Sequence, residues 1–337
     1  MGDKATARRT VMEVGVPTVP GTQGEVHDPQ EALEAAREIG FPVMIKATAG
    51  GGGKGMRVAP DEAGFERLFV QARNEADAAF GDPGVYLERF ITRPRHVEFQ
   101  VFGDSAGQVV HLGERDCSIQ RRHQKLIEEA PSPALDPQLR EAMGAAAVKA
   151  AEAIRYVGAG TVEFLLDEFG DFFFIEMNTR IQVEHTVTEV TMGLDLVKEQ
   201  IRVATGENLS FPVQNMVHRG HAIEFRINAE DPDRNFAPGL ITMYHPPGGP
   251  GVRLDTHIYT GYRVPPNYDS LLGKLIVHGH SREEAILRAR HTLDSFVIEG
   301  IATTIPFLSR ITRDPDFVAG KTDTGFVERF LADEGEA

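Results

Sequence analysis

The sequence predicts an α+β fold, in which short strands and helices are mixed along one chain of 337 residues. Apolar residues recur with helical spacing in two long segments, 61–80 and 136–156. Two pairs of short β-type runs, each joined by a turn that contains Gly and Asp, indicate antiparallel hairpins at 95–114 and 162–177. After about residue 210 the pattern changes to an alternating strand followed by turns rich in Gly and Pro, which indicates a second module.

The first ninety or so residues are expected to alternate between helices and short strands. The helix expected at 29–39 has Pro29 at its start and Gly40 after its end, which is the usual asymmetry of helix termini. Four apolar residues fall on one side of the helix expected at 61–80: Phe65, Phe69, Ala72 and Ala76. The other elements expected here are a helix at 3–14, strands at 43–46 and 85–90, and an extended segment at 57–58.

The rest of the chain is expected to contain three helices and five strands. The helices are expected at 136–156, 194–205 and 281–296. The strands are expected at 95–102, 109–114, 162–166, 172–177 and 221–227. In the last of these strands apolar residues alternate with Glu224 and Arg226.

Composition limits the classes of function. The net charge is −15, so a basic surface for nucleic acid is not expected, and local groups of Lys and Arg become candidate anion sites. Cys117 is the single cysteine, which excludes an intramolecular disulfide and a metal site of cysteines alone, and it fits a reducing, cytoplasmic compartment. No apolar run reaches the ~18 residues that a membrane-spanning helix needs.

Four consecutive glycines at 50–53 lie between two expected strands and precede Lys54. Glycine lets the backbone approach a ligand closely, so successive N–H groups can point at phosphate oxygens, and Lys46 ends the preceding strand. The run lacks the Gly-Lys-Ser/Thr ending of a Walker A loop, and a strand rather than a helix is expected after it. A phosphate-binding loop and a flexible hairpin turn both remain open.

Two acidic residues occupy the adjacent strands of the hairpin at 162–177. Glu163 and Glu176 each lie among apolar residues, where an unpaired carboxylate is costly. If they face each other they require a cation, and Asn178 shares the strand face of Glu176. Carboxylate and amide oxygens are ligands that suit Mg²⁺. The alternative is the exposed face of an ordinary hairpin.

Charged residues are concentrated in two further stretches, 114–125 and 178–185. In an acidic protein their cations form a candidate anion pocket made of Arg121, Arg122, Lys125 and Arg180. Glu184 is a candidate general base beside it. The alternatives are a solvated charged loop at 114–125 and a carboxylate that only complements a helix N-terminus. Thiol catalysis by Cys117 is not expected, because a lone cysteine among charges is usually inert.

Taken together and in order, these motifs resemble the biotin carboxylases, which are ATP-grasp enzymes. The segments that carry the resemblance are 1–4, 45–56, 88–91, 95–98, 114–125, 176–185 and 221–232. The stretches 114–125 and 178–185 separate this family from other ATP-grasp ligases. The resemblance implies an ATP-grasp domain at 1–210, with a lid subdomain at about 20–90, and a biotin carboxylase C-terminal domain at 211–335.

The resemblance also implies an activity and partners. Such enzymes are ligases that carboxylate biotin with ATP and bicarbonate, the first half-reaction of an acyl-CoA or pyruvate carboxylase, as in fatty acid biosynthesis. Biotin would come on a separate carrier protein or domain, and a carboxyltransferase subunit would be the second partner. The family normally has a Rossmann-like domain before Met-Gly-Asp-Lys, which is expected to be missing here, and both homodimer formation and turnover with biotin are expected to depend on it.

Several site residues follow from the same resemblance. The nucleotide would contact Lys4, Lys46, Gly52, Gly53, Glu88, Arg89, Ile91, His96, Gln120 and His123. Mg²⁺ or Mn²⁺ would be held by Glu163, Glu176 and Asn178. Bicarbonate would be bound by Lys125, Arg180, Gln182 and Val183. Glu184 would deprotonate bicarbonate, whose oxygen then attacks the γ-phosphate to give carboxyphosphate, and Arg226 would stabilise the biotin enolate.

One departure and two alternatives accompany the resemblance. Thr186 stands where the family usually has Pro, and only a small effect on the turn after Glu184 is expected. The alternatives are another ATP-grasp carboxylate ligase and an ATP-binding fragment without turnover. The cluster Arg180-x-Gln182-Val183-Glu184 favours a small anion such as bicarbonate over a bulky acid.

Overall fold

An eight-stranded sheet, antiparallel at every pairing, is the largest element of the fold. The computed structural model describes residues 4–49, 55–211, 216–231 and 235–336. The chain divides into two units: the sheet unit, residues 1–16 and 93–337, and the small unit, residues 17–92. Helices and strands are mixed along the sequence, which confirms the α+β class.

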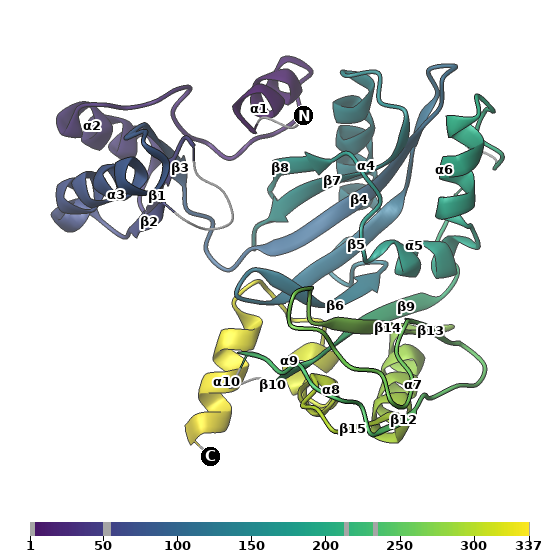
Figure 1. Cartoon of the computed structure of the whole chain (residues 1–337). Coiled ribbons are helices and arrows are strands. Elements are labelled where there is room, and N and C mark those ends of the chain that lie inside the picture. Colours follow the sequence, from purple (N-terminus) through teal and green to yellow (C-terminus); the bar gives the residue numbers. More distant parts are fainter. Residues whose placement is uncertain (1–3, 50–54, 212–215, 232–234, 337) are drawn as a thin grey trace. The chain divides into compact units, whose positions relative to one another are not determined.

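The spatial order of the strands in the large sheet differs from their order in the chain (Figure 1). It is β13-β14-β9-β6-β5-β4-β7-β8, so β9 from the second half of the chain pairs directly with β6 from the first half. One sheet therefore continues past residue 210, and the predicted domain division there stays a prediction. The strands are β4 (Arg95–Gly103), β5 (Val109–Arg121), β6 (Gln124–Ala130), β7 (Gly158–Leu166), β8 (Phe172–Asn178), β9 (His221–Asn228), β13 (Val252–Thr256) and β14 (Leu271–Gly279).

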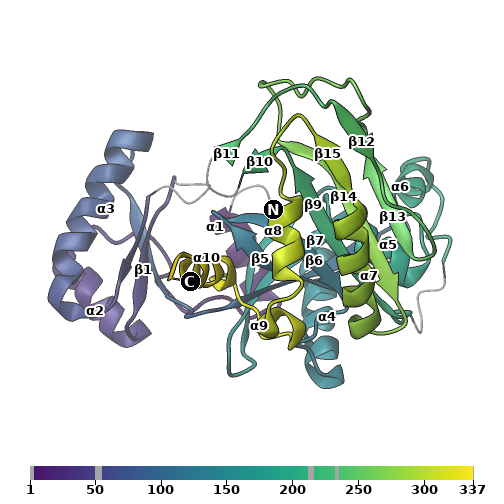
Figure 2. The same ribbon diagram turned by 90° about the horizontal axis from the view of Figure 1, so that it is seen from below.

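Helices cover the large sheet and close its hydrophobic cores. Helix α4 (Pro137–Glu152) begins where the Asp136 side chain accepts the Leu139 N–H, and its buried alanines pack on β4, β5 and β7 with helix α1 (Lys4–Glu13). Helices α7 (Arg282–Ser295) and α8 (Ile305–Ile311) lie beside β9 and β14 (Figure 2). Helix α5 (His185–Met192) packs on β9, β5 and β6, and α6 (Leu196–Ala204) packs on β7.

The small unit is a three-stranded sheet with two helices. The strand order is β2 (Met56–Ala59), β1 (Val43–Ala47), β3 (Val85–Arg89). Helix α2 (Pro29–Ile39) is capped by the Asp28 side chain and ends at Gly40, which confirms the expected boundaries. A 3-10 turn at Glu62–Gly64 leads into helix α3 (Phe65–Phe80), and the four apolar residues expected on one side are its buried ones: Phe65, Phe69, Ala72 and Ala76.

Two sequence expectations are changed by the structure. The helix expected to reach residue 156 ends at Glu152, because Arg155 takes a left-handed conformation (φ 50°) and the Tyr156 N–H bonds back to Ala151. The stretch 114–125 is not a solvated loop: it forms most of β5, a turn, and the start of β6, in the middle of the sheet.

The remaining elements are short or peripheral to the site. They are β10 (Glu230–Asp231), β11 (Asn235–Phe236), β12 (Met243–His245), β15 (Val297–Glu299), α9 (Pro315–Val318) and α10 (Phe326–Glu336). Among the described helices, none combines the length and the apolar character that a membrane span requires.

Candidate active site

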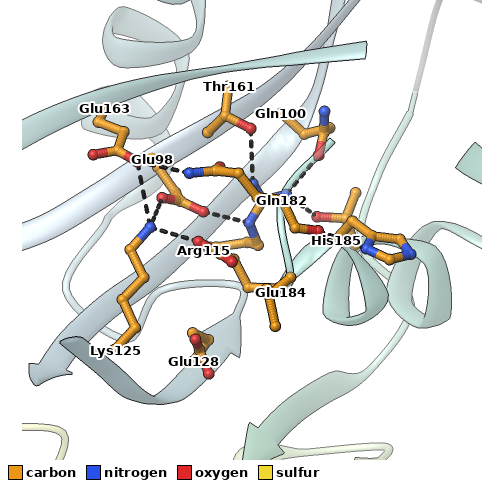
Figure 3. Close-up of polar contacts among 12 residues, drawn as sticks. Glu98, Gln100, Arg115, Lys125, Glu128, Thr161, Glu163, Gln182, Glu184 and His185 are labelled. Carbon is orange, nitrogen blue, oxygen red and sulfur yellow. Dashed lines mark hydrogen bonds and ion pairs between the residues drawn. The ribbon is translucent and has the colours of Figure 1, made fainter. Parts of the chain in front are cut away.

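Neighbouring strands of the large sheet place acidic and basic side chains against one another. Register puts Glu98 of β4 opposite Arg115 of β5 on one side and opposite Glu163 of β7 on the other. Residues 182–184, just before α5, and β9 add further polar groups (Figure 3). The site cluster, as it is called below, consists of Glu98, Arg115, Lys125, Glu128, Glu163, Gln182, Glu184, Glu224 and Arg226.

Lys125 is the cation shared by three carboxylates of the site cluster. Its Nζ donates to Glu98 Oε2 at 2.6 Å, to Glu184 Oε1 at 2.5 Å and to Glu163 Oε1 at 3.3 Å (Figure 3). Burial by itself would lower the pKa of Lys125, but Glu98 and the other neighbouring acids outweigh it and raise this pKa well above its ordinary value. Lys125 is therefore charged throughout the neutral range.

Arg115 is fully buried and uses all five of its N–H groups. Nε donates to Glu98 at 2.6 Å, and the remaining four N–H groups donate to Gln100, Thr188, Thr161 and Gln182 at 2.8, 3.0, 3.0 and 3.2 Å. These partners come from β4, β7, α5 and the segment before α5, so Arg115 joins the parts of the site. Its guanidinium fixes the position of Gln182, a residue predicted to bind bicarbonate.

Glu184 lies between two cations, at the residue before α5. Its Oε1 accepts from Lys125 and its Oε2 accepts from Arg226 Nη2 at 3.0 Å. Burial and the charge of Glu98 act to raise the pKa of Glu184, yet Lys125 and Arg226 prevail and hold this pKa below its ordinary value. Glu184 is thus an ionised carboxylate that can accept a proton, and its side chain makes no capping hydrogen bond to α5.

The acidic hairpin has the register expected from the sequence. Glu163 and Glu176 are directly opposed on β7 and β8, and Asn178 Nδ2 donates to Glu163 Oε1 at 2.9 Å. Gln182 Nε2 donates to the same oxygen at 2.8 Å, and His96 Nε2 lies 3.1 Å from Glu163 Oε2. Burial opposes ionisation of Glu163, but His96 and Lys125 outweigh it and lower its pKa. Two carboxylates and an amide within one hairpin are a donor set that fits Mg²⁺ or Mn²⁺.

Two of the four cations predicted to form an anion pocket, Arg121 and Lys125, are paired with acids in the structure. Arg121 is bonded to Glu230, Lys125 to three glutamates, and Arg180, which is exposed, to the Ile181 carbonyl at 3.2 Å and to Asn178. Charges within a sheet interior require such partners, because an unpaired buried ion is costly. The Val183 carbonyl, also predicted to contact bicarbonate, accepts from Lys274 Nζ at 2.7 Å.

Some predicted nucleotide residues of the sheet unit lie close together. His96 Nδ1 and Gln120 Nε2 are 2.8 Å apart, and Gln120 also donates to the Cys117 carbonyl. His123 is exposed in the turn between β5 and β6, with a φ of 63°, and Lys4 is the first residue of α1. Burial raises the pKa of the Cys117 thiol well above its ordinary value, which agrees with the expectation that it is not a nucleophile.

The small unit contains the other predicted nucleotide residues. Lys46 of β1 forms an ion pair with Glu88, its near neighbour on β3. The Arg89 N–H donates to the Pro20 carbonyl at 2.8 Å, and Ile91 is buried. Gly52 and Gly53 lie outside the described residues. All of these nucleotide assignments stay predictions.

Sequence reasoning gave no role to Glu98, Arg115, Glu128, Glu224 or Thr186. Glu98 and Arg115 lie within the motifs that carry the family resemblance, and Glu98 is a charged residue inside the strand expected at 95–102. That pattern is a signal for a buried ion pair. The contact between Thr186 and Glu224 had no such signal, because only the packing of α5 on β9 brings them together.

Comparisons with known proteins agree with this geometry. Residues 3–211 match the family model of the carbamoyl-phosphate synthase L chain ATP-binding domain, and residues 224–329 match that of the biotin carboxylase C-terminal domain. A biotin carboxylase of Nostoc sp. is 62% identical over 97% of this chain and 74% of its own length. A chloroplastic biotin carboxylase of Arabidopsis thaliana is 60% identical over 97% of this chain and 61% of its own length.

Solved structures of biotin carboxylases are also similar to this chain. A Campylobacter jejuni biotin carboxylase complex with β,γ-ATP aligns with a TM-score of 0.90 and 48% identity over 98% of this chain and 74% of that one. The biotin carboxylase domain dimer of Hydrogenobacter thermophilus 2-oxoglutarate carboxylase, with MgADP, ADP and bicarbonate, aligns with a TM-score of 0.90 and 50% identity over 98% and 73%. This chain thus spans 61 to 74% of the length of these relatives.

Proposed function

Because the chain belongs to the biotin carboxylase family, we propose that it uses ATP and bicarbonate to carboxylate biotin on a carrier. The reaction is the first half-reaction of an acyl-CoA or pyruvate carboxylase. The observation that carries the proposal is Glu184, a buried and ionised carboxylate held between Lys125 and Arg226. This arrangement places a proton acceptor between two positive groups, which suits a small anion that must lose a proton.

The chemistry assigned to these groups balances. Glu184 takes the proton of bicarbonate, and the oxygen so freed attacks the γ-phosphorus of ATP, which releases ADP and forms carboxyphosphate. Carboxyphosphate breaks down to CO₂ and phosphate. Phosphate takes the ureido proton of biotin, and the resulting enolate attacks CO₂ to give carboxybiotin. The positive charge of Lys125 and the N–H groups of the Gln182 amide stabilise the anionic substrate at the first step.

Arg226 is suited to the second part of the reaction. Its guanidinium reaches Glu184 through Nη2 at 3.0 Å and Glu128 through Nε at 2.6 Å, so it lies beside the proposed base. A fixed guanidinium stabilises a negative charge that develops next to it, here the enolate oxygen of biotin. The same residue therefore links the step at bicarbonate to the step at biotin.

A divalent cation is part of the proposed reaction. Glu163, Glu176 and Asn178 would hold Mg²⁺ or Mn²⁺, which supplies positive charge for phosphoryl transfer. The fit rests on the opposed register of the two glutamates and on the amide of Asn178 beside Glu163. The partners proposed are a biotin carboxyl carrier protein or domain and a carboxyltransferase subunit.

The test is phosphate release from ATP by the purified chain with Mg²⁺, with and without bicarbonate and free biotin. We expect release that requires bicarbonate, increases with biotin, and falls roughly 10²–10⁴-fold in Glu184→Gln. Glu199→Gln, a buried glutamate of α6 that accepts from Ser210, is the matched control and should behave like the unchanged chain. ATP binding without bicarbonate-dependent release would contradict the proposal and favour a nucleotide-binding fragment.

A further inference from the structure

Two fully buried glutamates face each other where β6 and β9 pair. Glu128 and Glu224 are Cα partners in the antiparallel register, and their side chains belong to the same face of the sheet as Arg226, two residues after Glu224. Directly opposed residues have Cβ atoms only about 4.5–5.5 Å apart. Two ionised carboxylates at that separation, away from water, would repel each other strongly.

The hydrogen bonds of the pair are incomplete in a specific way. Glu128 Oε1 accepts from Arg226 Nε, and Glu224 Oε2 accepts from the Thr186 hydroxyl. The second oxygen of each carboxylate, Glu128 Oε2 and Glu224 Oε1, is buried without a hydrogen-bond partner among the described residues. A proton between the two acids would turn these two orphaned acceptors into one O–H···O bond, which removes a large desolvation cost.

Burial and the neighbouring carboxylates outweigh the nearby cations and favour a proton on this pair. The groups that face it are Cys117 of β5, Lys125 of β6, Glu184 before α5, Thr186 of α5, Arg226 of β9 and Lys274 of β14. Lys125 and Arg226 are already bonded to Glu184, and Lys274 donates to the Val183 carbonyl. Burial, in part offset by Arg226, raises the pKa of Glu128 to about 7; burial and the charge of Glu128 raise that of Glu224 to about 8.

We propose that Glu128 and Glu224 hold one proton between them at neutral pH, and that this acid pair positions Arg226 beside Glu184. With the proton in place, the pair carries one negative charge, which matches the single bond from Arg226 to Glu128. Without it, a second negative charge appears next to Arg226 and draws the guanidinium away from Glu184 and from an incoming anion. The effect on turnover rests on the proposed function, whereas the shared proton does not.

Infrared spectroscopy of the full chain tests the proton without any need for turnover. We expect a carboxylic acid C=O band at neutral pH that disappears in alkaline buffer. Glu224→Gln should lack this band, because the new amide N–H can donate to the orphaned Glu128 Oε2 and, together with Arg226, stabilises ionised Glu128. Thr186→Val removes the hydroxyl that stabilises ionised Glu224, so it should move the loss of the band to higher pH. A band that persists unchanged in Glu224→Gln, or no acid band in the unchanged chain, overturns the shared proton.

The positioning role is tested by the pH profile of bicarbonate-dependent phosphate release. We expect the alkaline limb to move upward by about one pH unit or more in Glu224→Gln, since its amide cannot ionise, and by less in Thr186→Val. A merely structural residue would lower the rate equally at every pH. An alkaline limb that is identical in the three proteins overturns the positioning role even if the infrared band is present. If turnover is absent in all three proteins, the proposed function fails, and the infrared result alone decides the proton.

Discussion

Two of the directly opposed glutamate pairs in the large sheet differ in their surroundings, and this difference shifts the pKa of Glu163 in the opposite direction from the pKa values of Glu128 and Glu224. Glu163 faces Glu176 across β7 and β8, and Glu128 faces Glu224 across β6 and β9. Around Glu163, a lysine, a histidine and two side-chain amides lie within hydrogen-bond or ion-pair distance. Around Glu128 and Glu224, one arginine and one hydroxyl donate hydrogen bonds. One oxygen of each of these two carboxylates has no partner among the described residues.

The comparison separates the effect of register from the effect of partners. Both pairs are Cα partners across antiparallel strands, although a β-bulge adjoins Glu163, yet the pKa of Glu163 is lowered and the pKa values of Glu128 and Glu224 are raised. Burial acts in the same direction on all three residues, so the donors decide the outcome. A carboxylate kept ionised suits a metal ligand, and a carboxylate that retains a proton does not.

Removing the shared cation should produce the largest effect. Lys125→Met leaves Glu98, Glu163 and Glu184 without their common partner, so the free energy of unfolding should fall by roughly 3–5 kcal/mol at neutral pH. The loss should be smaller in mildly acidic buffer, where the three acids can take up protons. Urea denaturation at the two pH values measures both, with Lys149→Met on the exposed side of α4 as the control. Equal losses at both pH values would contradict this account.

The two pairs should give opposite dependences of stability on pH. The pKa of Glu163 is below its ordinary value of 4.5, so its contribution is present above about that pH and is lost as pH falls through the folded value. The pKa of Glu224 is raised from 4.5 to about 8, so stability should fall as pH rises between these values. Glu163→Gln should flatten the pH dependence of stability below about pH 4.5, and Glu224→Gln should flatten the decline between pH 4.5 and about 8, each by on the order of 2 kcal/mol.

Urea denaturation of both variants across acidic, neutral and alkaline buffers measures these slopes. Glu199→Gln serves again as the control for a buried amide. If Glu224→Gln retained the full decline of the unchanged chain between pH 4.5 and about 8, the assignment of a retained proton to that pair would be wrong.

The third-largest effect is expected on Mg²⁺ binding, which should depend on the Glu163–Glu176 pair and not on the Glu128–Glu224 pair. Glu176→Gln removes one oxygen of the proposed Mg²⁺ site, and the affinity of the chain for Mg²⁺ in the presence of ATP should fall roughly tenfold or more. Glu168→Gln, in the exposed turn of the same hairpin, should leave the affinity unchanged. Isothermal titration with Mg²⁺ measures both, and an equal loss in Glu224→Gln would remove the distinction between the pairs.

The smallest effect on the free energy of unfolding is expected when the hydroxyl of Thr186, an uncharged donor, is removed. Thr186→Val deletes the hydroxyl that donates to Glu224, so the free energy of unfolding should fall by about 1 kcal/mol at alkaline pH, where Glu224 is ionised. At acidic pH the loss should be smaller. Thr191→Val, a buried threonine of the same helix that donates to the Val187 carbonyl, is the control, and its loss should not depend on pH.

Local sequence determined much of this protein. The cap, proline and glycine around 29–39 set the helix boundaries, and the turn at 167–171 set the β7–β8 hairpin, in which a β-bulge next to Glu163 brings it opposite Glu176. These features depend on residues close together in the chain, where turn chemistry and periodicity are informative. The ordered motifs also identified the family, and with it Lys125, Gln182, Glu184 and Arg226 as residues of one site.

Tertiary structure alone decided which charges meet. Glu128 and Glu224 are brought together because β9 inserts beside β6, and no local pattern predicts that pairing. The alternation in β9 suggested one apolar and one polar face, but both faces are covered, by α7 and α8 on one side and by α5 on the other. Burial of the polar face gives Glu224, Glu128 and Arg226 their unusual electrostatics, because the same groups on a solvated strand would interact only weakly.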